Sequence, residues 1–308
     1  MSSLVALRSA VRAKLEKYSA GDVIVVAVSG GADSLALAEA TKLEGDKLAL
    51  QIIGLTIDHQ LQPGSEDQAA KVVSQLSFPC VIEKVKVEIT DGLEASARRA
   101  RYEVFEKFAK EKNAVAIFLG HTKDDQAETV LLGLARGSGA RSLSGMASEN
   151  GLYVRPFLEI TREQTVAACA ELKLQPWNDP HNDDPNFLRV RVRKNVLPIM
   201  ESELGPGIKD ALTRSAQLLR DDADALDAMA EEFWAKDKSL EIEALSKLAK
   251  AVRTRVLRLA LFESGVTQLS AEQVGRVEAL ISNWKGQGEV SLPSGVKVLR
   301  ISGRLTLS

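Results

Sequence analysis

The sequence predicts an α/β protein in which a parallel sheet covered by helices is followed by a second, mainly helical module. Three observations predict it. Blocks rich in β-branched residues alternate with helix-like blocks from about residue 23 to 156, which is typical of parallel strands joined by crossover helices. The chain then becomes mostly helical from about residue 208 to 284. Short alternating strands with turn glycines follow at 288–308, where we expect a small antiparallel sheet.

The elements follow in a regular order. An amphipathic helix is expected before Gly21. Expected strands lie at 23–28, 48–58, 80–89, 114–120 and 152–157, and the helices between them at 33–43, 64–76, 93–112 and 123–135. After Trp177 the composition changes to turn formers and acids, and basic residues come next. We therefore divide the chain into an α/β domain of residues 1–205 and a mainly helical domain of residues 206–308.

The bulk composition is that of a soluble globular protein. Hydrophobic residues make up 45% and charged residues 27% of 308 residues, and the net charge of −2 argues against a globally basic nucleic-acid binder while leaving a local basic patch open. No apolar run approaches the ~18–20 residues of a membrane span, and the first residues lack the apolar block of a signal peptide. The two cysteines form no CxxC pair, so a reducing, cytoplasmic location is expected.

A glycine-containing turn follows the first expected strand. In a parallel sheet, ligands gather at the carboxyl ends of the strands, and free N–H groups at the start of the next helix attract anions. The glycines let an anion approach the backbone, and the serines add hydroxyl donors, so the turn is suited to phosphate oxygens. Its residues are Ser29, Gly30, Gly31, Ala32, Asp33 and Ser34.

Asp33 stands in this turn without a neighbouring lysine, which distinguishes the turn from GxxxxGK[ST], and its adjacent glycines distinguish it from GxGxxG. A carboxylate close to phosphates is explained if Mg²⁺ bridges them, or if Asp33 merely caps the helix. Both interpretations stay open from these residues.

Further acids follow the fourth expected strand, in LGHTKDDQAETVLLGLA (residues 119–135). His121 falls in the turn, and Asp125 and Glu128 are three residues apart on one face of the next helix, at the same sheet edge as the first turn. Such acids can hold Mg²⁺ or grip an ammonium group. The alternative is that they complement the helix dipole.

The first turn resembles the PP-loop of ATP pyrophosphatases, and five further segments resemble the tRNA(Ile)-lysidine synthases in the family's order. The block at 119–146 is similar to GHHxDDQxETxLLxLxRGSG followed by GM, with Thr122 in place of a second histidine. The other segments are TIDHQLQPGSED, EASARRARYEVF, YVRPFLEITREQ and WNDPHNDDPNFLRVRVRKNVLP. Together they cover residues 22 to about 198, whereas the last third of the chain resembles the family only loosely.

The resemblance implies a ligase with ATP and Mg²⁺ as cofactors. It would attach free L-lysine to C2 of the wobble cytidine in an isoleucine tRNA with a CAU anticodon, through an adenylated intermediate that releases pyrophosphate. The catalytic residues implied are Asp33, Asp125 and Glu128. Asp33 and Asp125 would place the metal, and Asp125 and Glu128 would recognise lysine.

The same resemblance assigns the remaining site residues. The loop residues 29–34 and His121 would bind ATP. The substrate-binding arginines implied are Arg98, Arg101, Arg189 and Arg193. For the first two, a solvated basic helix face is the alternative; the last two are four residues apart and share a face if that segment is helical. In the C-terminal third, Arg253, Arg255 and Arg258 would either face the tRNA or simply be exposed.

Three other functions are weighed against this one. A PP-loop thiolase acting on tRNA cytidine would need cysteine pairs, which this chain lacks. A small-molecule ligase such as an NAD or GMP synthetase would lack the ARxxRY and DDQxET segments. A non-enzymatic RNA-binding module would leave the phosphate turn without a purpose. The motifs leave the oligomeric state open, a homodimer being one possible assembly.

Overall fold

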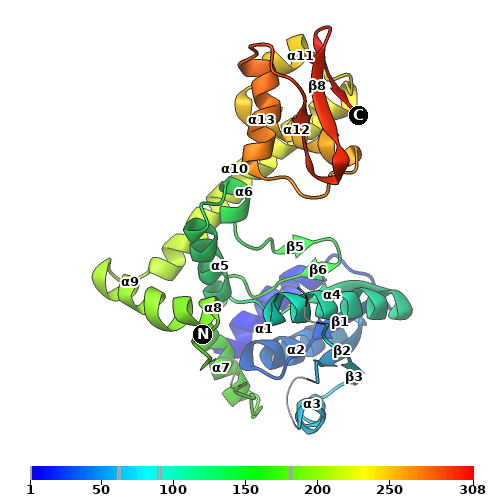
Figure 1. Ribbon diagram of the computed structural model, residues 1–308. Helices are drawn as coiled ribbons and strands as arrows, with labels where there is room; N and C mark the ends of the chain where they lie inside the picture. The colour runs from blue at the N-terminus through cyan, green and yellow to red at the C-terminus, as the bar shows by residue number, and fades with distance from the viewer. Residues whose placement is uncertain (1, 61–63, 89, 91, 180–182) are drawn as a thin grey trace. The chain divides into compact units, whose positions relative to one another are not determined.

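The computed structural model describes residues 2–60, 64–88, 90, 92–179 and 183–308. Contacts divide the chain into two compact units (Figure 1). Unit 1 comprises Met1–Arg136 and Gly145–Arg214, and unit 2 comprises Gly137–Ser144 and Ser215–Ser308. Among the described helices, none has both the length and the apolar character needed to cross a membrane.

Unit 1 is built on a six-stranded sheet with the order β3-β2-β1-β4-β6-β5. All neighbouring strands run parallel except the last pair, β5 and β6. The strands are β1 (Val23–Ala27), β2 (Gln51–Asp58), β3 (Cys80–Lys84), β4 (Ala114–Phe118), β5 (Glu149–Asn150) and β6 (Tyr153–Val154). The predicted parallel α/β fold is therefore confirmed, with a short antiparallel edge that the sequence pattern did not indicate.

Alternating side chains of the central strands bury both faces of this sheet. On β1, Ile24 and Val26 join one apolar core with helices α1, α2 and α7, whereas Val25 joins the other core, beneath α4. The same alternation on β4 sends Phe118 to the first core and Ile117 to the second. A continuous apolar strand such as VIVVAV is thus explained by burial on both sides.

The helices of unit 1 match most of the expected blocks, and α4 and α5 have the expected bounds (Figure 1). They are α1 (Ser3–Leu15), α2 (Ala32–Gly45), η1 (Asp46–Leu48), α3 (Ser65–Ser74), α4 (Leu93–Lys112), α5 (Lys123–Ala135), α7 (Arg162–Glu171), α8 (Leu188–Arg191), η3 (Val192–Val196) and α9 (Leu197–Glu203).

The third strand is shorter than expected, because it ends at Lys84 and not at residue 89. It lies at the edge of the sheet and pairs only with β2, whose last residue, Asp58, is the partner of Lys84. Beyond Lys84, at residues 85–88, the described part of the chain offers the alternating segment no further strand residue of β2.

The first helix is attached to the second by a buried carboxylate. Glu44, near the end of α2, is only 1% exposed and accepts hydrogen bonds from Arg8 at 2.6 Å and Arg12 at 2.8 Å. Lys47 completes the set at 2.9 Å. Burial opposes the charge on Glu44, but these cations outweigh it and lower the pKa of the carboxyl to about 2.

The strand order places a topological switch point between β1 and β4. The chain leaves β1 for β2 on one side, and β4 pairs with β1 on the other side. The connections that follow β1 and β4 therefore diverge at the carboxyl edge and leave a crevice between them, where α/β proteins bind their ligands. The start of α2 and the start of α5 both border this crevice.

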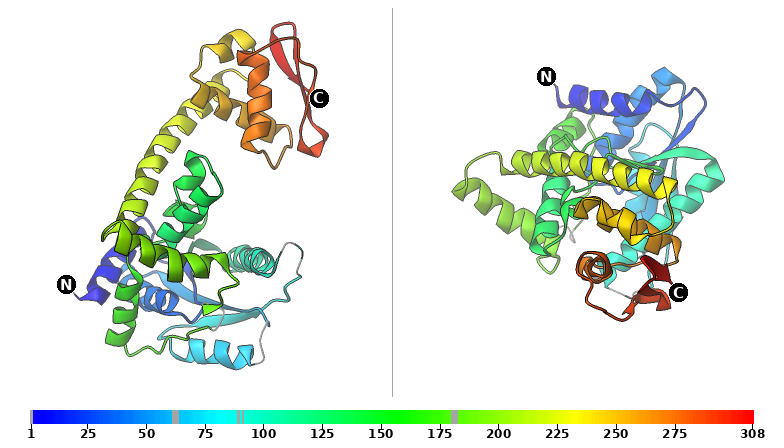
Figure 2. Two further views of the ribbon diagram at one scale, coloured as in Figure 1. Left: turned by 60° about the vertical axis from the view of Figure 1, so that its left-hand side comes forward. Right: turned by 90° about the horizontal axis from the view of Figure 1, so that it is seen from above.

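Unit 2 is helical with a small antiparallel sheet, as the composition predicted. The long α10 (Ile208–Lys236) is one helix that begins in unit 1 and ends in unit 2 (Figure 2). The other elements are α6 (Ala140–Leu143), α11 (Ile242–Ser246), α12 (Lys250–Glu263), α13 (Ala271–Ser282), β7 (Val290–Ser291), η4 (Pro293–Gly295), β8 (Lys297–Ile301) and β9 (Arg304–Leu307).

The three arginines of α12 have partners within unit 2. Arg253 is 9% exposed and donates to Glu278 of α13 at 2.5 Å and 3.0 Å, so the expectation that it faces tRNA or solvent is wrong. The guanidinium lies beside the apolar core of unit 2, and only a buried partner makes that burial tolerable. Arg255 pairs with Asp227, and Arg258 donates to the Leu269 carbonyl.

Candidate active site

The turn after β1 is closed by its own serines. The Ser34 hydroxyl accepts from the Ser29 amide at 3.1 Å and donates to the Gly31 carbonyl at 2.9 Å. Gly30 adopts φ +88°, and a Cβ there would lie 2.5 Å from a methyl group of Val72. Gly31 has an ordinary φ of −74°, and a Cβ there would lie 3.9 Å from Oγ of Ser29, an ordinary contact distance. Gly30 is thus required by the fold, whereas Gly31 leaves the backbone accessible to an anion.

Ala32 begins α2 directly after this turn. Its carbonyl accepts a hydrogen bond from the thiol of Cys169 on α7 at 3.4 Å, so the helix start is held against α7. The first N–H groups of α2 therefore have a fixed direction at the edge of the crevice, which suits them to bind phosphate oxygens.

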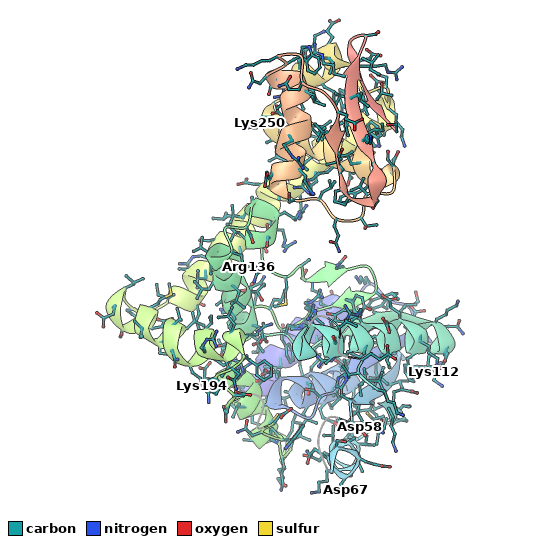
Figure 3. The ribbon with its side chains drawn as sticks, in the orientation of Figure 1. Asp58, Asp67, Lys112, Arg136, Lys194 and Lys250 are labelled. Carbon is teal, nitrogen blue, oxygen red and sulfur yellow. The ribbon has the colours of Figure 1, made fainter. Side chains whose placement is uncertain are left out.

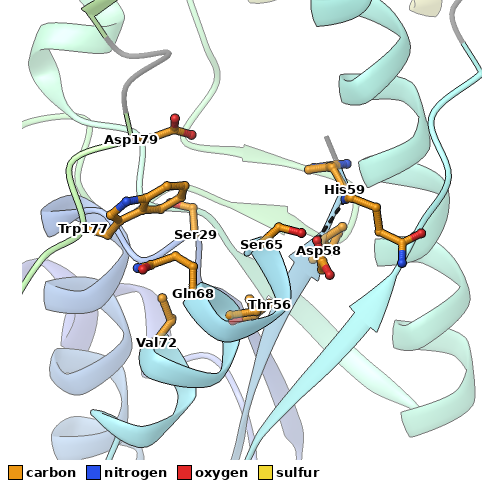
Figure 4. Close-up of a pocket in the computed structure, with 12 residues that line it drawn as sticks. Ser29, Thr56, Asp58, His59, Ser65, Gln68, Val72, Trp177 and Asp179 are labelled. Atoms are coloured by element: carbon orange, nitrogen blue, oxygen red, sulfur yellow. Dashed lines mark hydrogen bonds between the residues drawn. The ribbon is translucent and has the colours of Figure 1, made fainter. Parts of the chain in front are cut away.

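A pocket adjoins the turn on the side of β2 and α3 (Figure 4). Ser29, His59, Gln68 and Trp177 are among its lining residues. The backbone amide of Trp177 donates to the Gly30 carbonyl at 2.9 Å, so this segment is fixed to the turn. Burial and the charge of Arg101 lower the pKa of His59 to about 4, which keeps the imidazole neutral at pH 7. Asp58 and Asp179 also line it, so the pocket is a polar recess beside the phosphate turn in which the histidine carries no charge.

Asp33 points from the first turn of α2 toward α7. Its carboxylate accepts from the Thr165 hydroxyl and from Nε of Arg162 at 3.3 Å. Burial raises the pKa of Asp33, and the charge of Arg162 opposes that rise. Asp33 is therefore turned toward other charged side chains and does not act as a side-chain cap of its own helix.

Asp125 occupies the third position of α5 and is bound to the preceding turn. Its Oδ2 accepts from the Thr122 amide at 2.8 Å and from the Thr122 hydroxyl at 3.0 Å. Thr122, which replaces a family histidine, therefore serves as the N-cap of α5. The other oxygen of Asp125 lies 3.5 Å from Arg162 and 3.4 Å from Arg189. Burial opposes its charge, but these arginines lower the pKa of Asp125.

Glu128 lies on the same face of α5 as Asp125, as the spacing predicted. Its side chain is fully buried and accepts from Nε of Arg189 and Nε of Arg193, each at 2.6 Å. A second nitrogen of Arg193 donates at 3.1 Å. Such short charge-assisted bonds hold both guanidinium groups firmly.

The two arginines belong to one helical segment, so the expected shared face is present. α8 carries Arg189, and Arg193 lies in η3, a π-helical turn, a form that is frequent at functional sites. Lys194, labelled in Figure 3, points to a different partner and pairs with Asp183 at 2.5 Å. The segment therefore presents two of its cations to the acids of α5.

The other predicted residues lie around this cluster. His121 follows β4. Its Nδ1 is buried with no hydrogen-bond partner among the described residues, and burial lowers the pKa of the imidazole to about 4.

Arg98 is exposed on α4, and its guanidinium stacks over the Tyr102 ring at 4.8 Å from the ring centroid. Arg101 is exposed on the same helix, near His59 of the pocket. Neither arginine has an ion pair with Asp125 or Glu128 in the described part of the chain.

Arg162 is a central residue of this cluster to which no sequence motif assigned a role. It matched a family segment, but only the fold brings the start of α7 against Asp33 and Asp125. Its backbone amide also donates to Asp124 at 2.9 Å, and Lys209 pairs with that same acid at 2.6 Å. No local pattern indicates these contacts, because the residues come from four separate segments.

The acids also fit a magnesium ion that has nucleotide ligands. Within the described residues there is no group of three or more His, Cys, Asp or Glu side chains that could hold a metal alone. Mg²⁺ usually takes one or two carboxylates and completes its shell with phosphates and water. Asp33 and Asp125 face the same guanidinium, that of Arg162, and are the two carboxylates that could supply such a pair.

A second cavity lies beside Arg162. Its charged lining residues are Asp124, Arg162, Glu163, Arg193 and Lys209, and its apolar ones are Val166, Ala167 and Ala170. Acidic, basic and apolar side chains thus line the same cavity. Such a lining suits a zwitterion with a hydrocarbon stem.

Comparison with known proteins identifies the family. A PP-loop domain model matches residues 6–200, and the TilS substrate binding domain matches residues 240–306. The tRNA(Ile)-lysidine synthase of Thermobifida fusca is 46% identical over 98% of this chain and 96% of that protein. The corresponding protein of Streptomyces coelicolor is 47% identical over 92% and 85%.

Among solved structures, the U34-tRNA thiolase NcsA from Methanococcus maripaludis with its [4Fe-4S] cluster is similar, with a TM-score of 0.59. The similarity covers 71% of this chain and 79% of that chain at 16% identity, so it concerns the fold alone. The sequence relatives and the two family models together decide the assignment. The chain belongs to the tRNA(Ile)-lysidine synthase family.

Proposed function

We propose that this protein ligates free L-lysine to C2 of the wobble cytidine of an isoleucine tRNA with a CAU anticodon, converting ATP to AMP and pyrophosphate. One observation carries the proposal beyond family membership: Asp33 of the phosphate turn and Asp125 of α5 meet at the switch point through Arg162. ATP phosphates bound at the turn would face both acids and the paired arginines.

The first step joins the cytidine to AMP. The C2 oxygen attacks the α-phosphorus of ATP, and the bond to the departing pyrophosphate breaks. Gly31 and the first amides of α2 would hold the phosphates, with the nucleotide base toward the pocket of Trp177 and His59. Asp33 and Asp125 would hold Mg²⁺, whose charge offsets that of the phosphates.

In the second step the side-chain amine of lysine attacks C2, AMP leaves, and the nitrogen loses a proton. Roughly one lysine amine in a thousand is neutral near pH 7, so an acidic group must grip the ammonium or accept its proton. The lowered pKa of Asp125 keeps it ionised and suits it to grip the ammonium. The second cavity, with its cations, acids and apolar wall, is our candidate entry site for lysine.

Glu128 receives a different role in this proposal from the one its spacing indicated. Its carboxylate is fully buried and already accepts from Arg189 and Arg193. We therefore assign Glu128 to positioning these two arginines, which would contact the tRNA near the reacting cytidine. His121 is uncharged at neutral pH and would line the site without adding to its charge.

The remaining assignments follow from the same reaction. Residues 206–308 would form the tRNA-binding domain, residues 1–205 would form the catalytic domain, and the reaction would take place in the cytoplasm, where tRNA is available. Arg98 and Arg101, exposed on α4, would meet phosphates or the cytidine. The motifs and the fold are compatible with both a homodimer and a monomer.

A tRNA thiolase is the nearest alternative, and the cysteines disfavour it. Cys80 and Cys169 are both free, and one lies on β3 and the other on α7. Burial raises the pKa of Cys80, and it raises the pKa of Cys169 to about 11, so neither is an activated thiolate.

The test uses purified protein, ATP, Mg²⁺, radiolabelled lysine and tRNA transcripts that differ at the wobble base. We expect lysine incorporation and pyrophosphate release with the cytidine transcript, and neither with a uridine transcript. Absence of lysine incorporation into the cytidine transcript would reject the proposal. Sulfur incorporation from a labelled donor would favour the thiolase instead.

A further inference from the structure

Arg162 sits between the two acids that we assign to magnesium. Its Nε lies 3.3 Å from Asp33 and its Nη2 lies 3.5 Å from Asp125, so one guanidinium contacts carboxylates from two different helices, α2 and α5. Thr165, one turn further along α7, donates to the second oxygen of Asp33. α7 thus supplies both of the partners that Asp33 has among the described side chains.

The position of Arg162 is fixed at its backbone and not at its guanidinium. It is the first residue of α7, which is capped by Thr161 and Gln164, and its amide donates to Asp124 at 2.9 Å. By contrast, its side-chain distances exceed the 2.6 Å at which Arg189 and Arg193 hold Glu128. Charge-assisted bonds of normal strength are about 2.7–2.9 Å long. The guanidinium therefore neutralises the acids through weak contacts that can be exchanged.

We propose that Arg162 is a resident counter-ion which occupies the place of magnesium between Asp33 and Asp125 until the metal–nucleotide complex binds. The inference rests on the proposed function, in which these two acids hold the metal. With Mg²⁺ held by these two acids, Arg162 would give up both contacts and become available to an anion in the cavity it lines. Phosphate oxygens and the carboxylate of lysine are the anions that the reaction brings there.

This arrangement has a physical reason. Two carboxylates that face the same space without a cation repel each other. The Arg162 guanidinium, which contacts both, offsets that repulsion in the absence of the metal. It also competes with free metal ions, so that binding becomes favourable chiefly when ATP supplies further ligands.

The test measures metal binding by the full-length protein without ATP, lysine or tRNA, with Mn²⁺ as a paramagnetic probe. Arg162→Gln should lower the Kd for Mn²⁺ on the order of tenfold, because it removes a positive charge from the site. Arg162→Lys keeps the charge and should stay near the wild-type value. Lys123→Gln removes a nearby cation that pairs with Asp210 instead, and it serves as the matched control.

An Arg162→Gln protein that is folded but binds Mn²⁺ no more tightly than the wild type would overturn the inference. The gain should also disappear in the double variant Arg162→Gln/Asp33→Asn, and a gain that persists there would place the metal elsewhere. If Arg162→Gln does not fold, an NMR measurement on the wild-type protein tests the inference instead. Its Arg162 Nε–H resonance, assigned by its loss in Arg162→Lys, must shift when Mg²⁺ and a non-hydrolysable ATP analogue are added together; an unchanged resonance would reject the exchange.

These outcomes are distinct from those of the proposed function. Lysine incorporation by the wild type tests the reaction, whereas the Mn²⁺ titration contains no substrate. A failed titration with an active wild type would reject only the counter-ion role of Arg162. A successful titration with an inactive wild type would retain that role and reject the lysine ligation.

Discussion

Gly120, at the end of the fourth strand segment, packs directly against the backbone of Asp33. A Cβ on Gly120 would lie 3.0 Å from the Asp33 carbonyl oxygen and 3.2 Å from Cα of Ser34. Because the close neighbours are backbone atoms, no flexible side chain can move aside. This contact sets the distance between the phosphate turn and the loop that carries His121 and Thr122.

Gly120→Ala should therefore separate the two loops. We expect a loss of about 1–3 kcal/mol in the free energy of unfolding, as for other overpacked sites, and a weaker affinity for ATP. Thermal unfolding and nucleotide titration would measure both. Gly275→Ala, in the middle of α13 with open space around it, is the control and should stabilise the protein by about 0.5–1 kcal/mol. An equal affinity for ATP in Gly120→Ala and wild type would contradict the prediction.

The two glycines of the phosphate turn should respond differently to alanine. Gly30→Ala forces a positive φ on alanine and a clash with Val72, so it should cost roughly 2 kcal/mol or more of stability. Gly31→Ala makes only an ordinary contact with Ser29 and should fold normally, but its methyl group would obstruct the phosphates. Melting temperatures and ATP dissociation constants would separate the effects. Normal ATP binding by Gly31→Ala would remove that position from the phosphate site.

Asp33→Asn should abolish pyrophosphate release while the protein stays folded, because the amide removes the charge that we assign to the metal. Asp46→Asn is the matched control, since Asp46 caps the other end of the same helix and is 55% exposed. A pyrophosphate release assay with the cytidine tRNA would compare them. Pyrophosphate release by Asp33→Asn would contradict the prediction and show that Asp33 has only a structural role in the turn.

Arg189→Ala should lower the affinity for tRNA and make that affinity less dependent on salt concentration. Loss of one phosphate contact lowers the slope of log affinity against log salt concentration by roughly 1. Filter binding at several salt concentrations would give the slope, with Lys107→Ala on the exposed side of α4 as control. If the slope is unchanged and only turnover falls, Arg189 acts inside the site through Glu128 and not at the tRNA backbone.

Glu44→Gln should change the response of stability to acid. The folded pKa of Glu44 is about 2 against an ordinary value of 4.5, so its stabilising effect is complete above pH 4.5 and is lost as the pH falls toward 2. The variant should lose roughly 3 kcal/mol at neutral pH, and the difference from wild type should vanish in acid. Urea unfolding across this pH range would measure it. A difference that is constant with pH would point to packing instead.

The sequence determined the order and kind of most elements, because local patterns suffice for them. The bounds of α4 and α5 agree with their periodicity, and the phosphate turn follows a strand that is buried on both faces. The glycines and Asp33 of that turn, together with the acids three residues apart on α5, also indicated where phosphates and a cation would bind. These features depend on neighbours within a few residues of one another.

Tertiary structure decided which charges pair. Arg162 meets Asp33 across 129 residues, and Arg189 and Arg193 meet Glu128 across more than sixty, so spacing could not reveal that Glu128 is saturated by arginines. Arg253 appeared as a surface cation in the sequence but is buried against Glu278. The physical reason is the same in each case: a charge on a helix face can turn to solvent or to a partner, and only the packing of distant segments decides which.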